Sequence, residues 1–507
     1  MAQTAGSRQE VRTGLLIGGE IEGAENWFPV FDPAAPQETV GYAAAATREQ
    51  ARHAVDAADA AWGDWSALEP ERRAEILRDA LGALRDDNDE RVELLVRENG
   101  KIRAEAEVEL AVFSQRCELA AGMAGELDRT RRLLPRPRQG ETAATGEALT
   151  DVPAAPRFRS EVSALPLGVV TIIVPYNWPL AILAASLPYA LVAGNTVVVK
   201  PPPTTPLAVV STLRLLAERL PAGVLNVVTG SNEAVEPVIR DPRVRRIVFT
   251  GSTNAGKNIM RMAADNVTRV TLELGGNDPA IVLDDVELDA AAIERLTVGS
   301  FLTTGQVCMG IKRVYVHRSR FDELVEGMSA QLSHHHLGHG LRPETTMGPL
   351  NSARQRDFVR DLLDRARAAG GEVREFGTAD DETQRSGGYF LRPALVLDPP
   401  ADESIVTEEQ FGPALPILPY DDLDQVVDTV NRGWSGLCSS VWTSDLDRAA
   451  QVAARLRTGT TWINDANAVA QDDRAPFGGF RQSGMGRELG VEGLLEMTEA
   501  HTVTYPR

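Results

Sequence analysis

Cysteine is scarce in this chain, and its scarcity argues against a scaffold built on disulfides. Three cysteines, Cys117, Cys308 and Cys438, occur in 507 residues. An odd, sparse set without a pairing pattern indicates a reduced, intracellular protein. We therefore expect a cytoplasmic protein whose cysteines are free to serve packing or chemistry.

Long hydrophobic runs are also lacking. The first residues contain no apolar run, which argues against a secretory signal. The most apolar stretch, Leu180 to Val199, is interrupted by Pro188, Gly194 and Asn195. It therefore predicts a buried helix, a turn and a strand rather than a membrane span.

Positive charge is in deficit, because 52 Lys and Arg residues face 72 Asp and Glu residues and leave a net charge of −20. This balance argues against nucleic acid and anionic membranes as partners. A chain of this length exceeds one ordinary core, so two or three domains are expected.

The N-terminal part predicts helices. Thr47 and Gln50 form a capping box, and the apolar spacing that follows predicts one buried face from Ala51 to Trp62. Further helices are predicted from Pro70, over Glu90–Arg97, and from about Ala104 past Cys117, which is expected in the core. The Pro-, Gly- and Arg-rich stretch from 131 to 159 has no clear period and is typical of a linker.

The next hundred residues alternate between apolar runs and helical segments, which predicts a parallel sheet covered on both faces. The predicted strands are Val169–Val174, Thr196–Val199, Val224–Val228, Arg246–Phe249 and Arg269–Leu272. Distinctive residues follow them in order: Pro175-Tyr176-Asn177, Lys200, Thr229-Gly230, Thr250-Gly251-Ser252 and Glu273. Because ligands of such sheets bind beyond the carboxyl ends of the strands, these residues predict one binding edge.

A second α/β unit is predicted from Gly275 to about Gln482. It contains Cys308, and its expected elements are a strand at Arg313–Val316, helices around Phe321–Leu332 and Ser352–Ala369, and a strand near Ala394–Leu397. The last segment, His501–Tyr505, alternates like an exposed strand and needs a pairing partner.

A carboxylate at a strand end and a cysteine on a Gly-flanked loop suit covalent attack on a carbonyl. Taken alone, Cys308 is more simply a buried structural cysteine, Glu273 a solvated carboxylate and Asn177 a turn residue. Their motifs favour chemistry, whereas Cys438 lacks such a context and is expected to be structural.

Four motifs arrive in one order along the chain. They are Pro175-Tyr176-Asn177-Trp178-Pro179, Thr271-Leu272-Glu273-Leu274-Gly275-Gly276-Asn277, Gly305-Gln306-Val307-Cys308 and Glu408-Glu409-Gln410-Phe411-Gly412-Pro413. With these motifs the chain resembles the aldehyde dehydrogenase superfamily over nearly its whole length.

The resemblance implies an α/β fold of three parts. They are a Rossmann-like NAD(P)-binding domain (1–133 and 159–274), a catalytic domain (275–483) and a small β bridging element (134–158 and 484–507). The bridging element of the family pairs with another subunit, so a homodimer or homotetramer is expected. The implied reaction oxidises an aldehyde to the carboxylic acid with NAD(P)+, through a cysteine thiohemiacetal and a thioester.

The resemblance also implies roles for individual residues. Cys308 is the nucleophile, Glu273 activates the water that hydrolyses the thioester, and Asn177 with the Cys308 amide stabilises the oxyanion. The expected cofactor contacts are Val174, Tyr176, Lys200, Pro203, Gly230, Thr250, Gly251, Ser252, Gly256, Glu409 and Phe411. The expected substrate contacts are Trp178, Ile182, Val307 and Met309, whose apolar character favours a hydrophobic aldehyde.

Three departures from the family pattern bear on the cofactor. Pro203 stands where the family often has a Glu that binds the adenosine ribose and repels a 2′-phosphate, so NADP is plausible alone or beside NAD. Arg481 replaces the usual Lys and keeps its charge. Gly230-Ser231-Asn232 lacks a second glycine, which makes the phosphate loop there less regular.

Two rival functions remain open from the residues. One is a CoA-acylating semialdehyde dehydrogenase, against which Glu273 argues because acylating relatives usually lack it. The other is a non-catalytic binding protein of the same fold, which the presence of both Cys308 and Glu273 disfavours. The cluster His334-His335-His336 with His339 suggests a metal, but three consecutive side chains cannot all face one ion on a regular helix, so no metal site is expected.

Overall fold

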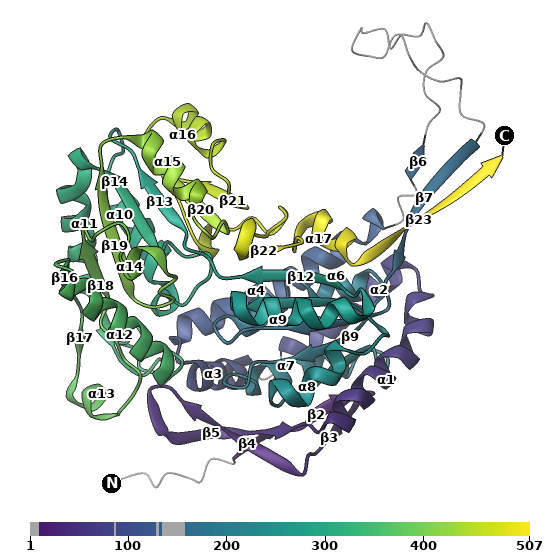
Figure 1. Cartoon of the computed structure of the whole chain (residues 1–507). Coiled ribbons are helices and arrows are strands. Elements are labelled where there is room, and N and C mark those ends of the chain that lie inside the picture. Colours follow the sequence, from purple (N-terminus) through teal and green to yellow (C-terminus); the bar gives the residue numbers. More distant parts are fainter. Residues whose placement is uncertain (1–9, 86–87, 128–130, 134–157, 507) are drawn as a thin grey trace, which may run out of the picture.

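The computed structural model describes residues 10–85, 88–127, 131–133 and 158–506. Two helix-covered β-sheets form the body, and a narrow β-arm projects from it (Figure 1). Apart from β22 (Gly484–Met485), the strands of the eight-stranded sheet precede residue 275, and the strands of the seven-stranded sheet lie between residues 279 and 463. Within these ranges, no helix is long and apolar enough to cross a membrane.

The eight-stranded sheet contains all five predicted strands. They are β8 (Val169–Ile173), β9 (Thr196–Lys200), β10 (Leu225–Val227), β11 (Val244–Gly251) and β12 (Arg269–Leu274). They lie in the order β12-β11-β8-β9-β10, and every neighbouring pair among them is parallel. The chain order reverses at β8, and such a switch point is where open α/β sheets bind ligands.

Three antiparallel strands extend this sheet. They are β2 (Leu15–Ile17), β3 (Glu20–Glu22) and β22 (Gly484–Met485). Beside it lies a small sheet of β1 (Val11–Thr13), β5 (Ala35–Ala45) and β4 (Asn26–Asp32).

Alternation of side chains along the strands explains why helices cover both faces. Val197 and Val199 belong to one hydrophobic cluster, and Val198 to another on the opposite face. The first cluster includes α6 (Leu187–Val192) and α7 (Leu207–Ala217), and the second includes α1 (Arg48–Ser66), α8 (Asn232–Ile239) and α9 (Thr253–Ala263). The prediction of a sheet buried on both faces is confirmed.

The helix after Thr47 begins as predicted but buries a different tryptophan. Thr47 and Gln50 cap each other's backbone N–H groups at 3.2 and 3.1 Å. Trp62 is only half-buried, whereas Trp65 is 1% exposed and donates from Nε1 to the Leu191 carbonyl. Trp62 therefore faces inward only in part, with its ring nitrogen buried, and Trp65 is the fully buried tryptophan that the sequence analysis missed.

The other N-terminal helices are confirmed as α2 (Pro70–Gly82), α3 (Asn88–Asn99) and α4 (Arg103–Gly122). Cys117 is fully buried on α4, as expected. α2 and α4 contact α6, and α3 contacts α7, so these helices form a further layer on this face of the sheet. Residues of α4 also line a cavity together with residues of α10 (Ala290–Phe301).

The seven-stranded sheet has the order β16-β18-β19-β14-β13-β20-β21. Its strands are Glu372–Glu375, Ala394–Leu397, Ala414–Tyr420, Arg313–His317, Pro279–Val282, Cys438–Trp442 and Thr460–Ile463 in that order. The flanking helices are α10 (Ala290–Phe301), α11 (Phe321–Ser333), α12 (Ala353–Ala368), α15 (Leu423–Arg432) and α16 (Leu446–Ala453). The predicted strands at 313 and 394 and the helices at 321 and 352 are confirmed.

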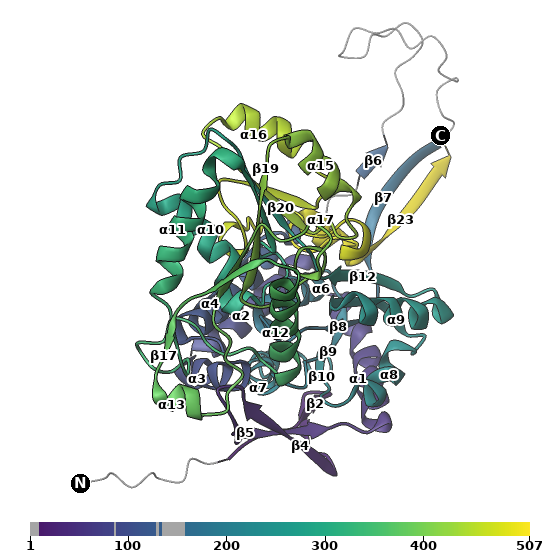
Figure 2. The same ribbon diagram turned by 60° about the vertical axis from the view of Figure 1, so that its left-hand side comes forward.

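The arm is a three-stranded antiparallel sheet that stands clear of the body in both views (Figure 2). β23 (Thr498–Pro506) pairs with β7 (Phe158–Pro166) along its whole length, and β7 pairs with β6 (Arg131–Leu133). Eight of the nine β23 residues are exposed. The exposed C-terminal strand is thus confirmed, while residues 134–157 of the expected bridging element lie outside the described residues.

Candidate active site

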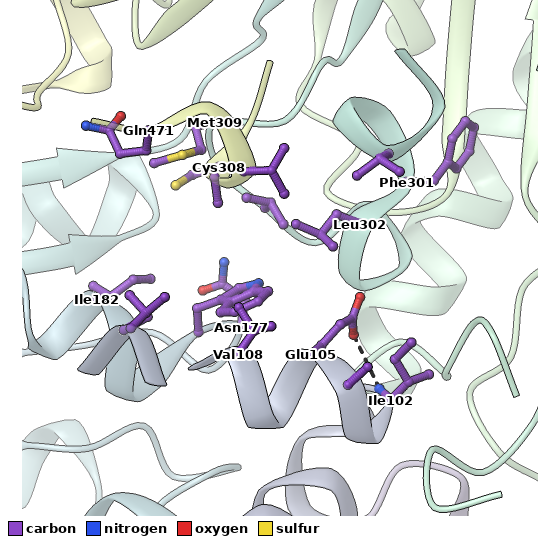
Figure 3. Close-up of a pocket in the computed structure, with 18 of the residues that line it drawn as sticks. Ile102, Glu105, Val108, Asn177, Ile182, Phe301, Leu302, Cys308, Met309 and Gln471 are labelled. Carbon is purple, nitrogen blue, oxygen red and sulfur yellow. Dashed lines mark hydrogen bonds between the residues drawn. The ribbon is translucent and has the colours of Figure 1, made fainter. Parts of the chain in front are cut away.

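Three elements bring Asn177, Glu273 and Cys308 into one place between the sheets. Asn177 lies in the turn after β8, Glu273 lies in β12, and Cys308 follows the short helix η4 (Leu302–Gly305). Cys308 and Asn177 line a cavity of about 540 Å³ (Figure 3). They also line a second cavity of about 270 Å³, which Glu273 lines with them. The Cys308 thiol is therefore accessible both to a ligand in the larger cavity and to a ligand in the smaller one.

The backbone before Cys308 is held in an uncommon conformation. Thr303, Thr304 and Gly305 have φ values of 50°, 57° and 73°. Left-handed backbone is costly for a β-branched residue, and such strain is maintained only where neighbouring contacts fix it. A Cβ at Gly305 would lie 2.3 Å from the Gly412 carbonyl oxygen, so only glycine allows this approach.

Gln306 ties the loop to its surroundings. Its Nε2 donates to the Thr303 carbonyl at 3.2 Å, and its Oε1 accepts from the Asn351 backbone N–H at 3.1 Å. Its own backbone N–H donates to the Thr303 carbonyl at 3.0 Å. Cys308 therefore follows a segment that is fixed by several contacts.

Lys312 is a buried cation that the sequence analysis missed. Its ammonium group donates to the carbonyls of Gly305 at 3.2 Å and Val307 at 2.6 Å, on both sides of Gln306. It also lies 5.7 Å from the centre of the Phe411 ring. A lysine four residues after the cysteine was the available signal, but its direction into the loop is a tertiary feature.

The surroundings of Cys308 favour the protonated thiol. Burial is the main cause of a pKa raised to about 12, the carboxylates of Glu409 and Asp278 contribute in the same direction, and Lys312 opposes them. A protonated thiol is a weak nucleophile, so its activation needs a base or an incoming positive charge.

Glu273 is suited to act as a base. It is 3% exposed, and no hydrogen-bond partner for either carboxylate oxygen is found among the described residues. Burial raises its pKa well above the ordinary value, with Glu488 adding to the effect and Arg487 opposing it. A carboxylate destabilised in this way takes up a proton readily near neutral pH.

Asn177 is fixed where an oxyanion donor is needed. It is 2% exposed, and its Nδ2 donates to the Gln306 carbonyl at 2.9 Å, two residues before the nucleophile. An amide nitrogen carries two N–H bonds, so one remains for a ligand. Asn99 holds the same turn by donating to the Tyr176 and Asn177 carbonyls at 2.5 and 3.3 Å.

Glu409 and Phe411 lie beside the smaller cavity with Tyr176. The Gly276 N–H donates to Glu409 Oε1 at 3.2 Å, and burial raises the Glu409 pKa to about 7. A Cβ at Gly275 would lie 1.9 Å from Glu409 Oε2, so glycine there leaves room for this carboxyl group. The Phe411 ring contacts Tyr176 edge-on at 6.1 Å between centroids.

A third cavity of about 460 Å³ lies between α8 and α9 and is lined by Lys200. Ser252 caps α9 by accepting from the Ala255 N–H, and the free amides of this helix start are a suitable site for a phosphate. Thr250, Gly251 and Ser252 line the 270 Å³ cavity, and Phe249 and Ala255 on either side of them line the 460 Å³ cavity. These spaces and polar groups fit an extended dinucleotide.

Four predicted cofactor residues line neither cavity. Val174 is buried, Pro203 is exposed in a turn, and Gly230 has φ +138° against the Ala46 backbone. Gly256 lies on α9 where a Cβ would meet Leu274 at 2.6 Å. The structure places these residues near the strand ends, and direct contact with a cofactor stays a prediction for them.

The 540 Å³ cavity contains every predicted substrate residue. Trp178, Ile182, Val307 and Met309 line it beside Cys308 (Figure 3). Sequence reasoning missed other apolar residues of its wall, namely Val108, Val112, Phe301 and Leu302. It also missed Glu105 and Arg116, because α4 is distant from the motifs in sequence.

The histidine cluster makes ordinary contacts. His336 and His335 hydrogen-bond the hydroxyls of Thr378 and Thr346, and His339 contacts the Asp32 carboxylate at 3.0 Å. Over the described ranges, no group of three or more His, Cys, Asp or Glu side chains could hold a metal ion.

A family model described as "Aldehyde dehydrogenase family" matches residues 21–503. The chain belongs to the aldehyde dehydrogenase family. It is 33% identical over 471 residues to betaine aldehyde dehydrogenase of Bacillus subtilis (strain 168), covering 92% of each chain. It is also 33% identical over 493 residues to an NADP(+) succinate-semialdehyde dehydrogenase of Escherichia coli (strain K12), covering 96% of this chain and 97% of that protein.

Solved structures agree with this family. The structure of betaine aldehyde dehydrogenase from Staphylococcus aureus in complex with NAD+ matches with a TM-score of 0.88 and 29% identity, covering 97% of this chain and 94% of that one. The chain is thus an oxidoreductase that oxidises an aldehyde to the acid with NAD or NADP. The predicted superfamily, fold class and reaction are confirmed.

Proposed function

We propose that this aldehyde dehydrogenase acts on uncharged aldehydes with an aliphatic or aromatic chain. The observation that carries the proposal is the position of Cys308, which lines an apolar cavity on one side and the cofactor-side cavity on the other. Relatives of equal identity are named for betaine aldehyde and for succinate semialdehyde, so overall similarity does not select a substrate class.

The reaction begins when the Cys308 thiol gives its proton to Glu273, which passes it on to solvent, and the sulfur attacks the aldehyde carbon. Negative charge develops on the carbonyl oxygen, where the second N–H of the Asn177 side chain and the Cys308 backbone N–H stabilise it. The strained loop and the Lys312 contacts support this step, because they keep the sulfur and its amide in one orientation.

The cofactor would lie along the strand ends, with Lys200 and the start of α9 at one end and Glu409 and Phe411 at the other. When bound, it supplies the hydride acceptor that lets the thiohemiacetal become a thioester. Glu273 then takes a proton from water, the resulting hydroxide attacks the thioester carbon, and the acid leaves as the thiolate of Cys308 is restored.

We also propose that NADP is accepted beside NAD. Pro203 carries no carboxylate to repel a 2′-phosphate, and among the described residues no carboxylate contributes to the pKa shift of Lys200. Burial lowers the Lys200 pKa to about 8, and a phosphate beside it would favour the charged form. In a Pro203→Glu variant the preference should move toward NAD, and an unchanged cofactor ratio would contradict the proposal.

We propose that the protein is a homodimer or homotetramer with the three-part domain division given above. The arm supports the assembly, because its exposed strand β23 includes Val503 and Tyr505 at 37% and 39% exposure. We also propose that the protein acts in the cytoplasm, and its three free cysteines support this compartment. Light scattering on the purified chain should give two or four subunits. A monomer would contradict the assembly.

The test of the reaction is reduction of NAD+ and NADP+ with a panel of aliphatic, aromatic and carboxylated aldehydes, without CoA and then with it. Reduction without CoA that disappears in Cys308→Ala supports the hydrolytic reaction. Activity only after CoA is added favours the acylating alternative, which Glu273 disfavours. Cofactor binding without any reduction favours a non-catalytic protein.

A further inference from the structure

An arginine and an aspartate from distant parts of the chain form an ion pair on the wall of the substrate cavity. Arg116 on α4 binds both oxygens of Asp473, with Nε to Oδ2 at 2.9 Å and Nη2 to Oδ1 at 2.8 Å. The remaining terminal nitrogen of Arg116 donates to the Ala181 carbonyl of α5 (Pro179–Leu183) at 2.7 Å. Both residues line the 540 Å³ cavity.

The geometry makes the guanidinium unavailable to a ligand. An arginine remains charged at all physiological pH values, and its planar fork matches a carboxylate with two parallel hydrogen bonds. Asp473 already occupies that fork, and the two side chains are only 11% and 14% exposed. A carboxylate brought in by a substrate would have to displace an internal partner of the same chemistry.

Burial shifts the pKa values of two other ionisable groups on this wall, Glu105 and His335, in the direction of their neutral forms. Burial raises the pKa of Glu105, whose oxygens accept from the backbone N–H groups of Thr303 and Ile102 at 2.7 and 3.3 Å. Burial, with the neighbouring histidines, lowers the pKa of His335 and favours its neutral form. The remaining lining is largely apolar, so the ion pair is the main charged feature that a substrate would meet in the cavity.

We propose that the Arg116–Asp473 pair is the specificity determinant that makes this cavity select uncharged aldehydes over aldehydes carrying a distal carboxylate. Asp473 acts as an internal substitute for that carboxylate. The proposal rests on the proposed function, because it concerns the substrate class of the same site. It also predicts that removing the internal carboxylate turns Arg116 into a receptor for an external one.

The experiment compares Asp473→Asn with the unmodified enzyme on two matched series, the 4- to 8-carbon ω-oxo acids and the unbranched aldehydes of equal length. The asparagine keeps the size of the side chain and removes its charge. We expect kcat/KM for the best ω-oxo acid to rise about tenfold or more, mainly through KM, because one added charge-assisted contact is of this size. The readout is the ratio of kcat/KM for the ω-oxo acid to kcat/KM for the unbranched aldehyde of equal length, and this ratio should rise about tenfold or more in Asp473→Asn whatever the change in kcat/KM for the uncharged series.

Two controls separate specificity from general damage. Asp472 is the neighbouring carboxylate and pairs with Arg474 on the surface, and neither residue lines the cavity. Asp472→Asn therefore removes the same charge outside the cavity. It should leave the ratio of kcat/KM between the two substrate series unchanged. Adding Arg116→Gln to Asp473→Asn should abolish the gain. Arg116→Gln alone leaves Asp473 unpaired and should lower activity with ω-oxo acids further.

Several outcomes would overturn the proposal. If Asp473→Asn folds, binds NAD+, and lowers kcat/KM for both series alike, the pair is only structural. If the unmodified enzyme prefers ω-oxo acids and Arg116→Gln loses that preference, Arg116 already serves as the receptor. If the unmodified enzyme oxidises neither series, the proposed substrate class itself fails, which is distinguishable because no variant is needed to see it.

Discussion

Removing the side-chain amide of Asn177 gives the sharpest test of how this site stabilises charge. In Asn177→Ala the oxyanion loses one of its two donors, and such a loss costs about 10²–10³-fold in kcat, or about 2.7–4 kcal/mol of transition-state free energy. The same substitution also removes the hydrogen bond to the Gln306 carbonyl at 2.9 Å. That loss of about 1 kcal/mol affects the stability of the folded chain rather than the reaction.

The surrounding contacts justify this separation. The Gln306 backbone N–H, its side-chain nitrogen and its side-chain oxygen retain bonds to Thr303 and Asn351 at 3.0, 3.2 and 3.1 Å. The Cys308 loop should therefore keep its conformation in the variant. Asn177 is one of many residues that line the 270 Å³ cavity on the cofactor side. Its loss should therefore change NAD+ affinity little.

The assay is the rate of NADH formation in the first turnover, measured by stopped-flow with a 1-deuterated aldehyde in parallel. We expect a 10²–10³-fold slower first turnover with a retained isotope effect and unchanged NAD+ binding, in line with the loss of one oxyanion donor. A loss below about threefold would refute the assignment of Asn177. A large loss together with weakened NAD+ binding would point to a disturbed loop instead.

Three further predictions concern neighbouring residues. Glu273→Gln should lower kcat by about 100-fold or more, since it removes the base at nearly constant shape, and a loss under fivefold would contradict the role. Because the Glu273 pKa is raised and only the deprotonated form is a base, kcat should rise with pH along an acid limb that begins above pH 4.5, and this limb should vanish in Glu273→Gln. Gly275→Ala would place a methyl group 1.9 Å from Glu409 Oε2 and displace this carboxyl group, so KM for NAD+ should rise. The melting temperature should fall only by the few degrees that an ordinary substitution costs. An unaltered KM would show that Glu409 does not hold the cofactor.

Local patterns in the sequence determined the elements and the chemistry they carry. The capping box at Thr47 and the alternating strands depend on neighbours within a few positions, and these predictions are confirmed. Parallel strands must align their carboxyl ends, so the meeting of Asn177 with the end of β12 could be inferred before any coordinates.

Contacts between distant residues were decided only by the tertiary structure. Arg116 and Asp473 are 357 positions apart, and no local period relates them. Lys312 was visible in the sequence, yet its direction toward the Gly305 and Val307 carbonyls depends on how β14 enters the seven-stranded sheet. The charge of the substrate cavity follows from such pairings, because an ion is neutralised by whatever the fold brings within a few ångströms of it.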